Sequence, residues 1–190
     1  MNDEFPFRQA CFKRKIEIIE YLVELGKRNK SKINIYACNG IAMSRACCGG
    51  HLDVVKYLLY KLKFKLNFNR FKGFRLACKY GQLDVVKSIF EYCRLTCTKI
   101  NIHIDYECAF RWACDNGYLE IVKVLLEYDK INIHTLHEKA FTCALQHRYF
   151  HIIKFLIEYS YKHNDIIELN NKMFDLIYYD PFVNHFEYLL

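Results

Sequence analysis

The sequence predicts an all-α solenoid, in which short helix–turn–helix units stack one after another along the chain. Three observations predict it. Similar segments recur with a period in the low thirties, which is typical of solenoids. Apolar residues within each segment recur at the spacing of one helix face. Only two prolines and seven glycines occur in 190 residues, of which 53% are hydrophobic. This composition excludes a disordered chain and a turn-rich β-sandwich.

Four segments align without gaps: RACCGGHLDVVKYLLY, LACKYGQLDVVKSIFE, WACDNGYLEIVKVLLE and CALQHRYFHIIKFLIE. Each has an alanine at its second position, and QACFKRKIEIIEYLVE is a fifth copy near the start. These reference alanines are Ala10, Ala46, Ala77, Ala113 and Ala144, spaced 36, 31, 36 and 31 residues apart. A degenerate sixth copy has Ile177 in the alanine position. We therefore predict a single repeat domain over 1–190, its first and last units being degenerate caps, with units at 5–36, 41–69, 72–103, 108–134, 139–168 and 172–190.

Each unit is expected to begin with a short helix that runs from three residues before the alanine to three after it, as in Phe74–Tyr80. Glycine then closes this helix in three repeats, because it adopts the left-handed conformation without steric cost. An acidic residue follows near the start of the second helix, where it is favourable against the helix dipole. The glycines are Gly50, Gly81 and Gly117, and the acidic residues are Glu17, Asp53, Asp84 and Glu120.

The second helix of each unit is predicted from one apolar face, as in Leu83, Val86, Ile89 and Phe90. An alternating polar and apolar tract such as Lys99–His103 follows it, and this pattern favours a short extended finger. The two 36-residue spacings predict longer fingers after the first and third units.

The chain resembles the ankyrin repeats, whose pattern is T-P-L-H-x-A-A-x-x-G-H followed by a helix of V-V-x-L-L type. Three motifs carry the resemblance: Ala46-Cys47-x-x-Gly50-His51, Ala77-Cys78-x-x-Gly81 and Ala113-Cys114-x-x-Gly117. Phe5–Ala10 fits the T-P-L-H-x-A frame. The resemblance implies a protein-interaction module that holds protein partners in a concave groove and with its finger tips.

Abundant Lys, Asn, Ile, Tyr and Phe also resemble the repeat arrays of large DNA viruses, which implies an effector or adaptor acting on host proteins. The interior repeats depart from the family pattern, since the histidine of the T-P-L-H corner is replaced by Ser44, Arg75, Arg111 or Thr142. Loss of this hydrogen-bonding corner predicts a less rigid turn between finger and helix.

Ten cysteines are expected to be thiols in a reducing compartment, because residues 1–12 do not resemble a secretory signal. Cys11, Cys47, Cys78 and Cys114 follow the reference alanines and are expected to pack as small hydrophobic residues. A looser group could be imagined as a zinc knuckle, but its spacing fits no common finger; its members are Cys93, Cys97, His103 and Cys108. His147 and His151 are expected to lie across a helix boundary and not to form a metal-binding pair.

We expect the protein to bind no metal and no cofactor, and we expect that it is not an enzyme. The sequence has no Gly-rich phosphate loop, no G-x-S-x-G and no H-E-x-x-H. A zinc-dependent or enzymatic protein built on the cysteines is a weaker alternative. No apolar run approaches the ~18 residues that a membrane span needs. We expect an intracellular, cytoplasmic monomer, in the host cytoplasm if the chain is viral.

Charge is distributed unevenly, because residues 1–80 carry 17 Lys and Arg against 6 Asp and Glu, and residues 81–190 carry 11 against 15. Lys61, Lys63 and Lys65 alternate with apolar residues, as Phe64 illustrates. Cations interleaved with aromatic side chains can grip a phosphate backbone. A nucleic-acid-binding protein that uses its basic N-terminal half is therefore the alternative function. We favour a finger with one packed and one solvated face.

Surface recognition by the first helices is the function that we favour. The residue before each alanine and the residue three after it share a helix face, and this face is expected to line the groove. Trp112 is either an interface anchor beside Tyr80 or a packing residue. The predicted partner-binding residues are Arg45, Leu76, Lys79, Tyr80, Trp112, Asp115, Asn116, Gln146 and His147. The apolar end at Leu189 and Leu190 is either part of a cap or a docking surface.

Overall fold

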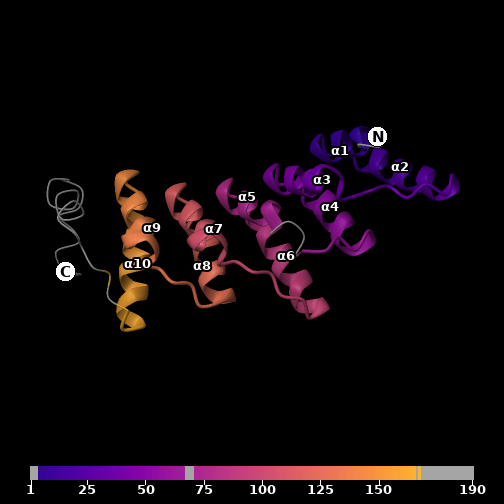
Figure 1. Ribbon diagram of the computed structural model, residues 1–190. Coiled ribbons are helices and arrows are strands. Elements are labelled where there is room, and N and C mark those ends of the chain that lie inside the picture. The colour runs from indigo at the N-terminus through magenta and orange to yellow at the C-terminus, as the bar shows by residue number, and fades with distance from the viewer. Residues whose placement is uncertain (1–3, 67–70, 166, 168–190) are drawn as a thin grey trace. The chain divides into compact units, whose positions relative to one another are not determined.

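The computed structural model describes residues 4–66, 71–165 and 167, and all regular elements within this part are helical (Figure 1). The chain divides into two compact units, Met1–Ile104 and Asp105–Leu190. Helices thus form where the repeat pattern predicts them. The predicted sixth unit, 172–190, lies outside the described residues. Over the described part, no helix combines the length and the apolar character that a bilayer crossing requires.

The first unit, Met1–Ile104, contains three successive helix pairs. Its first helices α1, α3 and α5 lie side by side, and α4 packs against α6 (Figure 1). The helix α4 continues directly into a short π-helical stretch, η1. The elements are α1(Phe5–Phe12), α2(Ile16–Arg28), α3(Ala37–Cys48), α4(Leu52–Lys56), η1(Tyr57–Lys61), α5(Lys72–Lys79) and α6(Leu83–Thr96).

The second unit, Asp105–Leu190, contains two further helix pairs in its described residues. Its helices are α7(Ile104–Asp115), which begins one residue before the unit boundary, α8(Leu119–Tyr128), α9(Thr135–Gln146) and α10(Phe150–Lys162). The helices α9 and α10 pack on each other as a hairpin.

Each first helix contributes the same small and large residues to the core. The four alanines Ala46, Ala77, Ala113 and Ala144 are completely buried, and Ala10 is 5% exposed. A large residue three positions before each alanine is also buried, and burial of an aromatic side chain of this size contributes strongly to stability. These residues are Phe7, Met43, Phe74, Phe110 and Phe141. Equivalent positions of the repeats are therefore buried to the same degree.

The turns between paired helices agree with the sequence prediction. Gly50, Gly81 and Gly117 have φ values of 68°, 73° and 81°. The four predicted acidic residues occupy the first turn of their second helices. The first-helix bounds differ slightly, because α5 begins two residues before the predicted Phe74 and ends one residue before Tyr80.

Each first helix has a left-handed turn at its start, which the sequence did not predict; in α1 and α5 this turn precedes the helix, and in α3, α7 and α9 it lies within the first four residues of the helix. The residue six before every reference alanine has positive φ: Glu4, Gly40, Phe71, Glu107 and Glu138. This conformation costs a non-glycine residue about 1–2 kcal/mol. Arg111 offsets part of that cost, since its Nε donates to the Tyr106 carbonyl (2.7 Å) and its Nη2 to the Asp105 carbonyl (2.9 Å).

Thr142 has the same role in the following repeat, because its Oγ1 donates to the Glu138 carbonyl at 3.0 Å. Arg111 and Thr142 both occupy the histidine position of the T-P-L-H frame. Other side chains therefore supply donors to the turn at these two repeats, and the reduced rigidity of the turns stays a prediction.

The segments between units alternate in burial, as expected for fingers with one packed face. Ile100 and Ile102 are buried, and Lys99, Asn101 and His103 are exposed. The expected lengthening of the finger after the third unit was largely wrong. The helix α6 has 14 residues and α8 has 10, so most of the additional residues extend the helix.

Candidate functional site

Hydrogen bonds connect the turn of one repeat to the turn of the next. In the first unit, His51 Nε2 donates to the Phe12 carbonyl at 2.9 Å, and Gln82 Nε2 donates to the Cys48 carbonyl at 3.2 Å. In the second unit, His151 Nε2 donates to the Gly117 carbonyl at 3.2 Å. These bonds align successive first-helix ends, where the predicted partner-binding residues lie.

The first-helix ends of the first unit combine aromatic rings with cations. The guanidinium of Arg45 lies over the Phe12 ring, with Cζ 5.0 Å from the ring centroid. Lys79 Nζ lies 5.7 Å from the centroid of Tyr80. The two rings are 50% and 48% exposed. Both contacts are cation–π interactions, which orient long, otherwise flexible side chains.

A hollow of about 370 Å³ opens between α3 and α5. Arg45 and Leu76, two of the predicted partner-binding residues, line it. Lys79 and Tyr80 are not among its lining residues. The full lining is Cys38, Asn39, Ile41, Ser44, Arg45, Cys48, Lys72 and Leu76. The hollow therefore has two cationic side chains and an apolar wall, and no carboxylate lines it.

The first-helix ends of the second unit hold the other predicted residues. Trp112 is half-buried, and Asn116 Nδ2 donates to its carbonyl at 2.8 Å. Asp115 Oδ1 lies 3.4 Å from His147 Nε2, so these two predicted residues come together. Gln146 ends α9 and is exposed. The side chains at this surface are thus neutral or acidic, apart from His147.

Sequence reasoning missed two residues of the first-unit surface, Phe12 and Lys72. Phe12 lies two residues after Ala10, and in the other repeats this position holds Cys48, Lys79, Asp115 or Gln146. The repeat register was therefore a sufficient signal for Phe12. Lys72 continues the basic segment that begins at Lys61, but its place in the hollow could not be predicted, because it depends on how α5 lies against α3.

The cysteines after the reference alanines pack in the core, as predicted. Cys11, Cys47, Cys78 and Cys114 are completely buried. Burial raises the pKa of the Cys11 thiol to about 12, and it raises the pKa of Cys47 and Cys114 as well. Thiols in this state are poor nucleophiles and poor metal ligands, since both roles require the thiolate.

The four residues of the zinc-knuckle pattern, Cys93, Cys97, His103 and Cys108, all lie in the part of the chain that the structure describes. In the described part of the chain, no group of three or more His, Cys, Asp or Glu side chains is placed to hold a metal ion. His147 follows the end of α9 and His151 lies in α10, so the two do lie across a helix boundary.

The basic finger has its apolar residues packed and its cations in solvent. Phe64 and Leu66 are buried, and Lys63 and Lys65 are exposed. Bases therefore cannot stack on Phe64, which removes the aromatic part of the predicted grip on nucleic acid. The exposed lysines remain available to an anionic surface.

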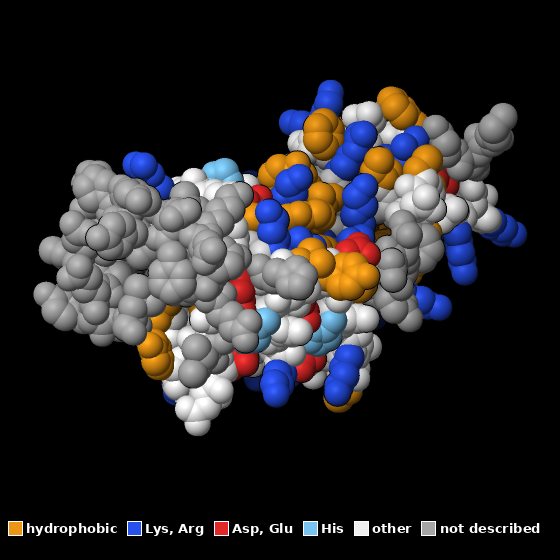
Figure 2. Space-filling view, turned by 60° about the vertical axis from the view of Figure 1, so that its left-hand side comes forward, with side chains coloured by type: hydrophobic (Ala, Val, Ile, Leu, Met, Phe, Trp, Pro, Cys, Tyr) orange, Lys and Arg blue, Asp and Glu red, His pale blue; other side chains and the backbone are white. Residues whose placement is uncertain are grey.

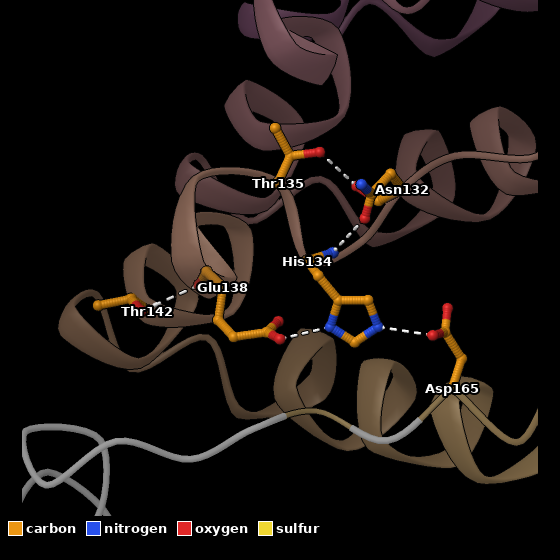
Figure 3. A network of polar contacts seen from close by, with 6 residues as sticks. All are labelled: Asn132, His134, Thr135, Glu138, Thr142 and Asp165. Carbon is orange, nitrogen blue, oxygen red and sulfur yellow. Dashed lines mark hydrogen bonds and ion pairs between the residues drawn. The ribbon is translucent and has the colours of Figure 1, made fainter.

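A polar network that the sequence did not suggest lies beside the last finger (Figure 3). The ring of His134 lies between two carboxylates: Nδ1 contacts Glu138 Oε1, and Nε2 lies 2.7 Å from Asp165 Oδ1. Desolvation lowers the pKa of His134, but the bonds and charges of both carboxylates outweigh it and raise the pKa above its ordinary value. Asp165 follows α10, 31 residues away, and no local pattern could reveal it.

Comparison with known families agrees with this architecture. Residues 74–167 match the family model of ankyrin repeats (3 copies). The matched region contains the predicted repeats around Ala77, Ala113 and Ala144. The chain therefore carries ankyrin repeats, a class that generally mediates protein–protein interaction. No curated protein matches the chain.

Proposed function

We propose that this chain is a non-enzymatic interaction module that binds a protein partner through its first-helix surface. We define this surface as the ends of the first helices with the residues beside them. Each unit has its own part of this surface: the first unit contributes Phe12, Arg45, Lys72, Leu76, Lys79 and Tyr80, and the second, independently, contributes Trp112, Asp115, Asn116, Gln146 and His147. One observation carries the proposal: in every described repeat the reference alanine is buried, while aromatic and charged neighbours remain at least partly exposed.

The composition of this surface supports a protein partner. Aromatic residues and arginine dominate binding energies at protein interfaces, and Phe12, Arg45, Tyr80 and Trp112 are of these types. Cation–π contacts and turn-to-turn hydrogen bonds hold part of the surface in one geometry before binding. Such preorganisation reduces the entropy lost on association. The resemblance to arrays of large DNA viruses supports a host protein as the partner, with the finger tips adding contacts and the chain acting as an adaptor.

The test is an affinity capture that compares the wild type with a Tyr80→Ala/Trp112→Ala double variant. We expect the double variant to lose the bound partner. A Tyr21→Ala/Tyr161→Ala variant is the matched control, because both tyrosines are exposed, by 64% and 54%, and lie outside the first-helix surface. Equal capture by all three proteins would refute the proposal. Tyr80→Ala alone serves if loss of Trp112 lowers the melting temperature.

Nucleic-acid binding by the basic N-terminal half is the second candidate, and the exposed Lys63 and Lys65 favour it. We then expect the chain to bind generic single-stranded DNA or RNA with an affinity that falls steeply as salt rises. The reason is that binding neutralises phosphates and releases their counterions. Fluorescence anisotropy at increasing salt concentrations measures this. Binding that is absent at low salt would remove the candidate.

A further inference from the structure

In the first unit, the first helices carry charges of positive sign only. The first helices α1, α3 and α5 contain no carboxylate, and their five cations are Arg8, Arg45, Lys72, Arg75 and Lys79. The second helices α2, α4 and α6 mix both signs. Figure 2 shows lysine and arginine side chains interspersed with hydrophobic ones on the visible face of the molecule. The first-helix layer therefore presents a field of one sign to a partner.

Within this layer, the hollow between α3 and α5 has the features of a binding site for two adjacent side chains of a peptide, one charged and one apolar. Arg45 and Lys72 line it from different helices, and Ile41 and Leu76 form apolar wall. A guanidinium recognises a carboxylate through paired N–H donors, and a nearby ammonium adds a point charge. A volume of about 370 Å³ accommodates a few side chains and not a folded element.

We infer that this hollow binds an acidic segment of the protein partner, with a carboxylate between Arg45 and Lys72 and an adjacent apolar side chain against Ile41 and Leu76. This inference rests on the proposed function and names the chemistry of the partner. Charge complementarity selects the segment and speeds its encounter. The apolar contact adds affinity that salt does not screen.

The same contacts favour a peptide over a nucleic acid as the occupant. Arg45 and Lys79 each cover a face of an exposed ring, Phe12 and Tyr80, and a stacked base would have to displace them. Phe64 in the basic finger is buried. The apolar wall at Ile41 and Leu76 offers nothing to a sugar–phosphate backbone, but it suits a leucine- or phenylalanine-type side chain.

The experiment is a selection from a random peptide library on the full chain, with the wild type and an Arg45→Glu/Lys72→Glu variant as parallel targets. We expect wild-type selections enriched in Asp or Glu beside an apolar residue. The variant should instead select Lys and Arg. The best acidic peptide, measured by fluorescence anisotropy, should bind the variant about tenfold or more weakly and lose affinity as salt rises.

A Lys63→Glu/Lys65→Glu variant is the matched control, because it makes the same change in net charge on exposed side chains of the finger. It should bind the acidic peptide within about twofold of the wild type. An equal loss in both variants would show unspecific attraction and overturn the site. Circular dichroism verifies folding, and Arg45→Ala/Lys72→Ala replaces the reversal variant if that variant unfolds.

The other outcomes separate this inference from the proposed function. Selected peptides without acidic enrichment would overturn the acidic partner and leave the interaction module standing. A library from which the wild type selects nothing would count against both. Displacement of the acidic peptide by a generic twelve-nucleotide RNA, with tighter RNA binding, would overturn the inference in favour of nucleic-acid binding.

Discussion

The first helices of the two units share their repeat positions and differ in charge. Those of the first unit carry five cations and no carboxylate. In α7 and α9 of the second unit, two cations stand against four carboxylates: Arg111 and Lys139 against Asp105, Glu107, Asp115 and Glu138. The repeat thus determines where a surface side chain lies, while its chemistry varies independently from one repeat to the next. Under the proposed function, the two units would meet different regions of a partner.

The first helices of the two units, with the residues at their ends, also differ in what their charged side chains contact. In the second unit, Arg111 binds turn carbonyls, His147 lies by Asp115, and His134 lies between two carboxylates. In the first unit, Arg45 and Lys79 lie over aromatic rings. Contacts of the first kind stabilise the unit itself, whereas a cation above a half-exposed ring can still meet an anionic partner. If the two units have equivalent cores and differ only in these contacts, matched core substitutions should cost the same in both units, and substitutions at the charged contacts should not.

The largest effect is expected in the shared core. Phe74 in the first unit and Phe110 in the second occupy the same repeat position, and each is 1% exposed. Either substitution by alanine should cost about 3–5 kcal/mol of unfolding free energy, through lost burial and a cavity. Chemical denaturation followed by circular dichroism measures it. A cost under about 1 kcal/mol in one unit alone would show that the scaffolds differ.

The next effect distinguishes two turn glycines. Gly117 and Gly50 both have positive φ, but an added Cβ at Gly117 would lie 2.9 Å from the Tyr149 ring, and at Gly50 it would meet only the flexible amide of Gln82. We expect Gly117→Ala to cost about 2–4 kcal/mol, the sum of backbone strain and overpacking. Gly50→Ala should cost about 1–2 kcal/mol. Thermal melts of both variants provide the ranking, and the reverse order would contradict this geometry.

A smaller effect concerns His134. Because its carboxylate neighbours raise its pKa in the folded state, its stabilisation is fully present below the ordinary histidine pKa and is lost as pH rises through the folded pKa. His134→Ala should cost about 2 kcal/mol at pH 6 and less at pH 9, since a charge-assisted bond disappears with the proton. Urea denaturation at both pH values measures the difference. A cost independent of pH would mean that the ring only fills space.

The smallest effect is the corresponding charge contact of the first unit. Arg14 Nε lies 3.1 Å from both carboxylate oxygens of Asp53. Burial raises the pKa of Asp53, but the hydrogen bonds from the Val54 N–H and from Arg14 lower the pKa by more than burial raises it. The net shift of the pKa is therefore downward. This stabilisation is present above the ordinary aspartate pKa and is lost as pH falls through the folded pKa.

Since the Arg14 and Asp53 side chains are 59% and 38% exposed, Arg14→Ala should cost no more than about 1 kcal/mol at pH 7. The cost should fall as pH drops below the ordinary aspartate pKa and through the folded pKa, which is opposite to the behaviour of His134. Denaturation of the variant at pH 7 and pH 3 tests this contrast. A larger loss at pH 3 would contradict it.

The repeat pattern predicted most of the fold because burial within a helix is periodic along the chain. The positions of Ala46, Ala77 and Ala113, the buried thiols beside them and the glycine turns all follow from that period. It also placed Asp115 and His147 correctly at neighbouring helix ends. The longer α6 escaped prediction because Arg94, Leu95 and Thr96 suit a helix as well as a finger. The division into six units stays a prediction.

Gly117 has one property that the local sequence determines and another that only the tertiary structure determines. Its left-handed φ could be predicted from one repeat, because only the neighbouring backbone is involved. The Tyr149 ring that would meet its Cβ comes from the following repeat, and so does the His151 donor to its carbonyl. Likewise, Arg45 could be predicted to face outward, but not to cover Phe12 and line a hollow with Lys72. Such contacts depend on the offset between stacked helix pairs. This offset arises from the packing of whole side chains, and no periodic pattern in the sequence encodes it.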